Sequence, residues 1–215
     1  MRGIRRLVVA AATVTAAAAL GAGVATPAGA ATVSPAAEAA ATSAARTADA
    51  TVSYSQWLSD ATAATAPALS YLQQRVAAGT FHGTPAIVLD IDNTSLASYF
   101  YPTTYPTPAN PPVLQLAQYA AAHGVKVLFV TARPDLIDLA TEINLTAVGY
   151  TVDHLYSRNP LQLLESIQTF KTDTRRKLVA EGYDIVANVG NNTTDLDGGY
   201  ADAAFKLPDY DGLLS

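Results

Sequence analysis

The chain has 215 residues, 50% of them hydrophobic and 14% charged, with a formal net charge of −5 at pH 7 and no cysteine. This length suits one medium-sized domain with its own hydrophobic core. The mild acidity, without a clustered basic face, argues against a nucleic-acid polymer as partner, and the lack of cysteine excludes a disulfide framework, thiol catalysis and a cysteine-linked lipid anchor.

The first 30 residues have the composition of a secretory signal peptide. A positively charged start is followed by an Ala/Val/Leu-rich stretch and by the small residues Ala28-Gly29-Ala30. We predict cleavage near Ala30 and secretion of the mature protein, with the general secretory and twin-arginine routes both open. Glycine and proline interrupt the apolar stretch, which disfavours a stable membrane anchor. Residues 31–52 are rich in Ala, Thr and Ser and are predicted to be a disordered linker, because they carry too little apolar surface to fold.

The remaining residues, 53–215, are predicted to form a single domain that begins with a helical extension. Over 53–80, apolar residues recur at helical spacing in two segments separated by Pro67, and Gly79 is well placed to end the second. The only tryptophan, Trp57, lies in the first segment and is interpreted as a packing anchor.

After this extension, β-branched runs alternate with helical patterns. The predicted strands are 86–91, 125–131, 154–157, 185–189 and 204–207, and the predicted helices are 112–122, 134–147 and 170–181. This alternation predicts an α/β fold, a Rossmann-like parallel sheet flanked by helices on both faces. The short basic stretch TRRKL, 174–178, is expected to be a solvated helix face.

Polar side chains collect at one edge of the predicted sheet, because the carboxyl ends of parallel strands lie together. The residues at this edge are Asp90, Asp92, Asn93 and Thr94 after the first strand, Thr131 and Arg133 after the second, Asn191 and Asp195 after the fourth, and Lys171 from the helix before the fourth. The three histidines, His82, His123 and His154, fall at the opposite edge and are interpreted as structural or surface residues.

The two carboxylates after the first strand raise a question of charge. Asp90 and Asp92 point the same way along a strand, and such crowding costs free energy unless a cation, a hydrogen-bond network or a shared proton relieves it. A calcium loop is excluded, because Ser95 stands where it needs glycine and Tyr101 where it needs glutamate. Crowding also raises the proton affinity of one carboxylate, which leaves one ionised and the other able to carry a proton.

These residue types suit the cleavage of a phosphate ester. A phosphate dianion repels a carboxylate nucleophile, so the site needs a divalent cation together with hydroxyl or cationic donors. Asp90, Asn191 and Asp195 offer hard oxygen ligands suited to Mg²⁺, and Thr131 and Lys171 offer the donors.

Four motifs carry a family resemblance over roughly residue 55 to the end. DIDNT, VTARP, FKTDTRRKL and GNNTTDLDG occur in the order seen in haloacid-dehalogenase-like phosphatases. The chain most resembles the secreted acid phosphatase branch, which includes class B-like bacterial acid phosphatases and plant vegetative storage proteins.

This resemblance implies a set of roles for the residues at the sheet edge. Asp90 attacks phosphorus to form an aspartyl-phosphate, and Asp92 acts as general acid and base. The implied phosphate-binding residues are Thr131, Lys171 and Arg133, and the implied Mg²⁺ ligands are Asp90, Asp92 through its backbone carbonyl, Asn191 and Asp195. One departure is Asn191, where most members of the family have aspartate. An amide attracts Mg²⁺ less strongly, so Asn191→Asp is expected to lower the Mg²⁺ concentration needed for half-maximal activity.

Between the first two motifs, residues 95–113 are too few for a large cap domain. Tyr99, Phe100, Tyr101 and Tyr105 are expected either to form an aromatic wall beside the leaving group or to pack a proline-stiffened loop. The predicted function is a secreted Mg²⁺-dependent acid phosphatase acting on small phosphomonoesters. A non-catalytic binding or storage protein and a phosphotransferase remain as alternatives.

Overall fold

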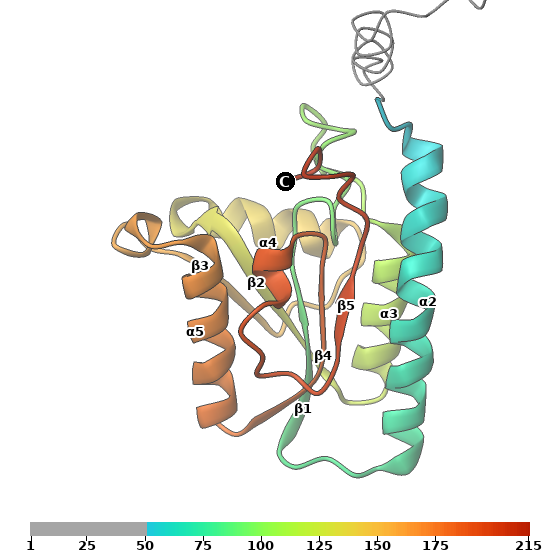
Figure 1. The fold of residues 1–215 in the computed structure, drawn as a ribbon, viewed down its shortest axis with the longest axis vertical. Coiled ribbons are helices and arrows are strands. Elements are labelled where there is room, and N and C mark those ends of the chain that lie inside the picture. Colours follow the sequence, from blue (N-terminus) through green and yellow to red (C-terminus); the bar gives the residue numbers. More distant parts are fainter. Residues whose placement is uncertain (1–50) are drawn as a thin grey trace, which may run out of the picture. The chain divides into compact units, whose positions relative to one another are not determined.

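The computed structural model describes residues 51–215, so the predicted signal peptide and nearly all of the predicted linker lie outside it. These residues form a five-stranded parallel sheet flanked by helices, which confirms the predicted α/β fold (Figure 1). The strands are β1 (Thr84–Leu89), β2 (Lys126–Pro134), β3 (His154–Arg158), β4 (Tyr183–Gly190) and β5 (Ala204–Lys206). The helices are α2 (Tyr54–Ala78), α3 (Pro111–Ala122), α4 (Asp138–Ala147), α5 (Ile167–Ala180) and α6 (Thr193–Leu196), with short 3₁₀ turns at Asp135–Ile137 and Gln162–Leu164.

The strand order β3-β2-β1-β4-β5 places a topological switch point between β1 and β4. The chain builds outward from β1 to β3 on one side and then returns to β4 on the other side. In open parallel sheets, ligands bind in the crevice outside the carboxyl ends of the strands that flank such a point. The loops that follow β1 and β4 therefore meet at the expected binding edge.

Helices cover both faces of the sheet, with α2 and α3 on one side and α5 on the other (Figure 1). The larger core cluster packs α2, α3 and α4 against the sheet through Leu72, Leu116, Leu145 and Phe129. The smaller cluster packs α5 on the opposite face through Phe170 and Leu178. The sheet is thus buried on both faces, as expected for a parallel sheet.

The helical extension is one continuous helix, α2, and not the two segments expected around Pro67. Ser53 caps its start, and Gly79 ends it in a left-handed conformation with φ 64. Proline removes one backbone hydrogen bond, but Ala68 and Leu72 in the next turn are fully buried in the core. Packing on α3 therefore outweighs the local penalty of the proline.

Most element boundaries differ by a few residues from those predicted, and two of these differences lie near the site. The segment predicted as one helix over 134–147 begins with the end of β2 at Pro134 and a 3₁₀ turn before α4 starts at Asp138. Helix α5 starts at Ile167, capped by the Ser166 side chain, so Lys171 lies in its second turn. No helix within residues 51–215 has the length and apolarity needed to cross a bilayer.

Candidate active site

The loop that follows β1, residues 90–96, is held closed by its own hydrogen bonds. The Ser95 amide donates to the Ile91 carbonyl at 2.9 Å, and the Ser95 hydroxyl donates to the Asp90 carbonyl at 2.6 Å. Asn93 has φ 56, a left-handed conformation that asparagine tolerates better than most residues. The two aspartates are therefore carried by a tight turn at the carboxyl end of β1.

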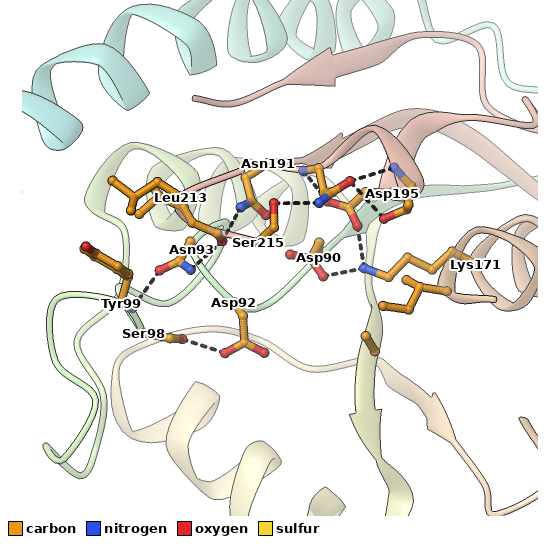
Figure 2. A pocket seen from close by; sticks show the side chains of 15 residues that line it. Asp90, Asp92, Asn93, Ser98, Tyr99, Lys171, Asn191, Asp195, Leu213 and Ser215 are labelled. Carbon is orange, nitrogen blue, oxygen red and sulfur yellow. Dashed lines mark hydrogen bonds and ion pairs between the residues drawn. The ribbon is translucent and has the colours of Figure 1, made fainter. Parts of the chain in front are cut away.

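A buried lysine joins the first motif to the fourth. Lys171 Nζ lies 2.5 Å from Asp90 Oδ1 and 2.6 Å from Asp195 Oδ1, and its side chain is only 3% exposed (Figure 2). Burial alone would lower the pKa of Lys171, but the two carboxylates outweigh burial, and the pKa lies above its ordinary value. The lysine is therefore a cation whose charge is already shared by two anions.

Asp92 has a different set of partners. Arg133 donates to both of its oxygens, from Nε to Oδ2 at 2.9 Å and from Nη2 to Oδ1 at 2.7 Å. The Ser98 hydroxyl donates to Oδ1 at 2.6 Å, and Arg133 is itself held by a 3.2 Å hydrogen bond to Thr141. This two-pronged pairing fixes the Asp92 carboxylate at the mouth of the site.

These partners set the proton affinities of the two aspartates in opposite directions. Burial, reinforced by the nearby Asp195, raises the pKa of Asp90 to about 7, although Lys171 opposes the shift. Burial also tends to raise the pKa of Asp92, but the hydrogen bonds from Arg133 outweigh it and leave that pKa below its ordinary value. Without a bound cation, Asp90 is thus the more basic of the two carboxylates. This is the reverse of the roles implied by the family resemblance, in which Asp92 carries the proton.

Stability of the metal-free protein should depend on pH through Asp90. Its folded-state pKa of about 7 lies above the ordinary value of 3.8, so this group favours folding below 3.8 and loses that contribution as pH rises through 7. We expect the free energy of unfolding, measured by denaturant titration with a chelator present, to fall over this range. Asp90→Asn should flatten the slope. Equal slopes in the two proteins would contradict the assignment.

The loop after β4 is shaped by a close approach that only glycine permits. A Cβ on Gly190 would lie 2.3 Å from the Cβ of Asp195. Asp195 Oδ2 accepts from the Asn192 amide at 2.8 Å, and Asn192 in turn caps α6. Both oxygens of Asp195 are therefore engaged, one with Lys171 and one with the start of α6, a short helix that the sequence patterns did not indicate.

The basic stretch TRRKL is not simply a solvated helix face. Arg175 is fully buried, and its guanidinium donates to the backbone carbonyls of Asp195, Asp197 and Gly199. Arg176 and Lys177 are exposed as expected. The prediction was wrong for Arg175, because its side chain satisfies the carbonyls of the loop that carries the fourth motif.

Five of the predicted site residues border one pocket of about 460 Å³. They are Asp90, Asp92, Lys171, Asn191 and Asp195. Thr131 is 1% exposed, and its hydroxyl accepts from the Arg133 amide at 3.2 Å. Ala132 reaches the pocket in place of Thr131 and Arg133. The Arg133 guanidinium pairs with the Asp92 carboxylate and does not border the pocket.

The predicted aromatic wall reduces to one residue. Tyr99 borders the pocket, whereas Phe100 and Tyr101 pack edge-on against Tyr54, with ring centroids 5.5 and 5.4 Å away. Tyr105 is 62% exposed and donates to a backbone carbonyl in α4. Three of the four aromatic residues therefore serve loop packing or face solvent.

Residues 213–215 also border the pocket, and sequence reasoning missed them (Figure 2). Asn93 and Asn191 both donate from their side-chain amides to the Leu214 carbonyl, at 2.8 and 3.0 Å. Nothing in the pattern of these last residues indicates a site, because the contact is made by a backbone atom.

The oxygen atoms at the carboxyl ends of β1 and β4 fit a hard divalent cation. Asp90 Oδ2 and the main-chain oxygen of Asp92 accept no hydrogen bond from the described residues, and Asn191 Oδ1 accepts only one, from Thr94. Within residues 51–215, no group of three or more His, Cys, Asp or Glu side chains is arranged to hold a metal. The fitting set instead combines one carboxylate, one amide and one main-chain oxygen, which are ligand types that Mg²⁺ accepts alongside water. Asp195, the fourth predicted ligand, is left out of this set because its two oxygens are engaged by Lys171 and by the Asn192 amide.

Comparison with known proteins identifies relatives of this chain. The family model described as HAD superfamily, subfamily IIIB (Acid phosphatase) matches residues 11–213. The Stem 28 kDa glycoprotein of Glycine max is 33% identical over 105 residues, 47% of this chain and 41% of that protein. Vegetative storage protein 1 of Arabidopsis thaliana is 29% identical over 143 residues, 56% of this chain and 52% of that protein. The matches thus span about half the length of these curated relatives or less.

A solved structure supports the same fold. The class C acid phosphatase from Bacillus anthracis aligns with a TM-score of 0.55 and 25% identity, covering 68% of this chain and 67% of that one. A second structure of that enzyme, with tungstate bound, aligns with a TM-score of 0.53 over the same shares.

Proposed function

Since this chain belongs to the HAD superfamily, subfamily IIIB of acid phosphatases, we propose that it hydrolyses small phosphomonoesters by attack of Asp90 on phosphorus. The observation that carries the proposal is the 460 Å³ pocket, which gathers Asp90, Asp92 and Lys171 from segments far apart in the chain. A buried carboxylate at the switch point, with one oxygen held by a lysine, is an oriented nucleophile.

These contacts support a nucleophilic step at Asp90. A carboxylate oxygen of Asp90 bonds to phosphorus as the bond from phosphorus to the leaving alcohol breaks, and water later cleaves the resulting aspartyl-phosphate. Lys171 holds Asp90 in place through its 2.5 Å contact and balances the added charge of Asp195. Orientation of this kind removes much of the entropic barrier to attack.

Asp92 supplies and recovers the proton. It protonates the leaving oxygen and then takes a proton from the attacking water. Because Arg133 holds the pKa of Asp92 below its ordinary value, we expect this guanidinium to shift toward the substrate when the ester binds. The shift would raise the proton affinity of Asp92 and bring a cation to the phosphate.

A divalent cation is part of this proposal. The residues that would hold it are Asp90, the main-chain oxygen of Asp92 and Asn191. Bound Mg²⁺ supplies positive charge that lets a dianionic ester approach two carboxylates. Burial of Asp90 beside Asp195, with one lysine between them, leaves a net negative cluster that favours such a cation.

A storage or binding role on the same fold is the second candidate. The similarity to vegetative storage proteins of Arabidopsis thaliana favours it. The retention of both Asp90 and Asp92 in one pocket favours catalysis, because binding alone does not need the pair. Transfer of the phosphoryl group to an alcohol would use the same residues with a different acceptor.

Export is also part of the proposal. It rests on the charged, apolar and small-residue order of residues 1–30, and cleavage near Ala30 is the expected processing step. Mass determination of the protein recovered from culture medium tests it.

Hydrolysis of a chromogenic aryl phosphate by the mature protein tests the activity. With Mg²⁺ present we expect turnover, and a chelator should lower kcat by roughly 10²-fold or more, because the negative cluster then repels the ester. Re-adding Mg²⁺ should restore the rate. Asp153→Asn changes an ion pair with Lys126 outside the pocket. This variant should keep the activity and the Mg²⁺ dependence of the wild type, which shows that loss of an aspartate elsewhere in the fold does not affect turnover. Turnover unaffected by the chelator would reject the metal-dependent mechanism, and no turnover under any condition would favour the storage role.

A further inference from the structure

We infer that the main-chain carbonyl of Leu214 is a positioning group of the active site, which sets the orientation of the Asn191 amide toward the bound cation. The inference rests on the proposed function, since it concerns the same cation. It assigns a role to residues 209–215, a segment that none of the four motifs includes.

The Leu214 carbonyl lies between two loops of the site. Asn93, in the loop after β1, donates to it from Nδ2 at 2.8 Å, and Asn191, in the loop after β4, donates from Nδ2 at 3.0 Å. Asn93 and Asn191 are buried, with 7% and 3% exposure. One acceptor therefore fixes two side chains that border the pocket.

Residues 209–215, which carry this carbonyl, are held in place by contacts near both ends of the segment. The Leu214 side chain is 1% exposed and packs with Trp57 and Ala61 of α2. The Leu214 amide donates to the Asp209 carbonyl at 3.1 Å, and the Tyr210 hydroxyl lies 2.8 Å from Asp60 of α2. The position of the carbonyl is thus set by the helical extension, outside the catalytic motifs.

The hydrogen-bond inventory leaves one orientation for the Asn191 amide. A carbonyl only accepts, so the group that faces Leu214 is the NH₂. The Thr94 hydroxyl accepts from the Asn191 backbone amide at 2.9 Å, so its own proton is directed to Asn191 Oδ1 at 3.1 Å. Asn191 Oδ1 keeps a second lone pair, and this is the atom offered to the cation.

The same contact explains why the fourth motif carries an amide in place of the family's usual carboxylate. An aspartate at position 191 would put a carboxylate oxygen about 3 Å from the Leu214 carbonyl, where two acceptors repel each other. In the intact chain, Asn191→Asp therefore loses a hydrogen bond while it gains a charge for the cation. The gain in Mg²⁺ affinity that the sequence predicts for Asn191→Asp is therefore offset by the loss of the hydrogen bond to the Leu214 carbonyl.

A double-mutant cycle separates this role from general packing. The four proteins are the wild type, a variant lacking residues 213–215, Asn191→Asp, and the combination. The readout is the rise in melting temperature with added MgCl₂ in the absence of substrate, which gives a half-saturating Mg²⁺ concentration for each protein. Leu72→Ala, a buried truncation in α2 away from the pocket, is the control for lost stability alone.

Deletion of residues 213–215 should raise the half-saturating Mg²⁺ concentration roughly 10-fold or more, because the free amide can turn its NH₂ toward the cation. Asn191→Asp should restore Mg²⁺ binding in the deleted chain, since a carboxylate presents an oxygen in either orientation. In the intact chain the same substitution should lower the metal-free melting temperature. Leu72→Ala should lower the melting temperature and leave the half-saturating concentration unchanged.

Equal Mg²⁺ half-saturation in the wild type and the deleted chain, or no rescue by Asn191→Asp, would overturn the inference. If the deleted chain does not fold, Tyr210→Phe replaces it, with Tyr71→Phe as the matched control that loses one hydroxyl contact to Arg75. If Tyr210→Phe raises the half-saturating Mg²⁺ concentration more than Tyr71→Phe does, the inference is supported. Equal effects of the two substitutions overturn it. A wild type with neither a Mg²⁺-induced shift nor turnover would instead reject the proposed function, and the inference with it.

Discussion

Asp90→Asn is expected to abolish phosphatase turnover and to leave a folded protein that is at least as stable as the wild type when no metal is present. The nucleophilic carboxylate is lost, so kcat for an aryl phosphate should fall on the order of 10⁴-fold or more. Stability should hold because Asp90 is buried beside Asp195, and its raised pKa shows that folding disfavours its charged form. An amide at this position removes one of two charges that compete for Lys171.

Asp184→Asn is the matched control for this substitution. Asp184 is also a buried aspartate, 9% exposed, but it lies at the start of β4, where it accepts from the His82 amide at 2.8 Å and lies 3.6 Å from Arg75. Its replacement should lower the melting temperature and spare turnover, the opposite of the result at Asp90. An Asp90→Asn protein that keeps wild-type turnover would rule out the aspartyl-phosphate route.

Much of the fold follows from local pattern. Strand-like runs alternate with helical ones from β1 onward, and parallel strands bring their carboxyl ends to one edge whatever the loop details. This is why Asp90, Asp92, Asn191 and Asp195 could be placed at one edge from their positions after β1 and β4. Lys171 could be placed near them because α5 leads into β4.

The contacts that sequence reasoning missed depend on tertiary packing or on backbone atoms. The continuity of α2 through Pro67 depends on burial against α3, and local propensity argues the other way. Arg175 looks like a surface charge until the carbonyls of the loop after β4 surround it. The Leu214 carbonyl carries no side-chain signature at all, so a motif cannot report it. The pairing of Arg133 with Asp92 was equally invisible, because either residue has several possible partners at this edge.

Lys171→Met is expected to be the most destabilising single substitution at the site. The lysine side chain is 3% exposed and lies between the carboxylates of Asp90 and Asp195, whose side chains are 9% and 5% exposed. Without the positive charge of Lys171, the buried carboxylates of Asp90 and Asp195 either face each other as anions or force Asp90 to take up a proton. Removing one partner of a buried ion pair typically costs about 3–5 kcal/mol of unfolding free energy. Turnover should be lost as well, since Asp90 is no longer held. Denaturant titration with a chelator present, together with the aryl phosphate assay, measures both effects.

The pH dependence and the partner variants show whether charge is the cause. The stability lost in Lys171→Met should return in part as pH is lowered, because Asp90 then takes up a proton and the repulsion falls. Adding Asp195→Asn to Lys171→Met should also recover stability, although each substitution alone lowers it. Lys126→Met removes a lysine whose side chain is 48% exposed and paired with Asp153, and it should change little. If Lys171→Met is no less stable than Lys126→Met at neutral pH, then Lys171 does not neutralise the buried carboxylates, and the charge balance on which the site depends is wrong.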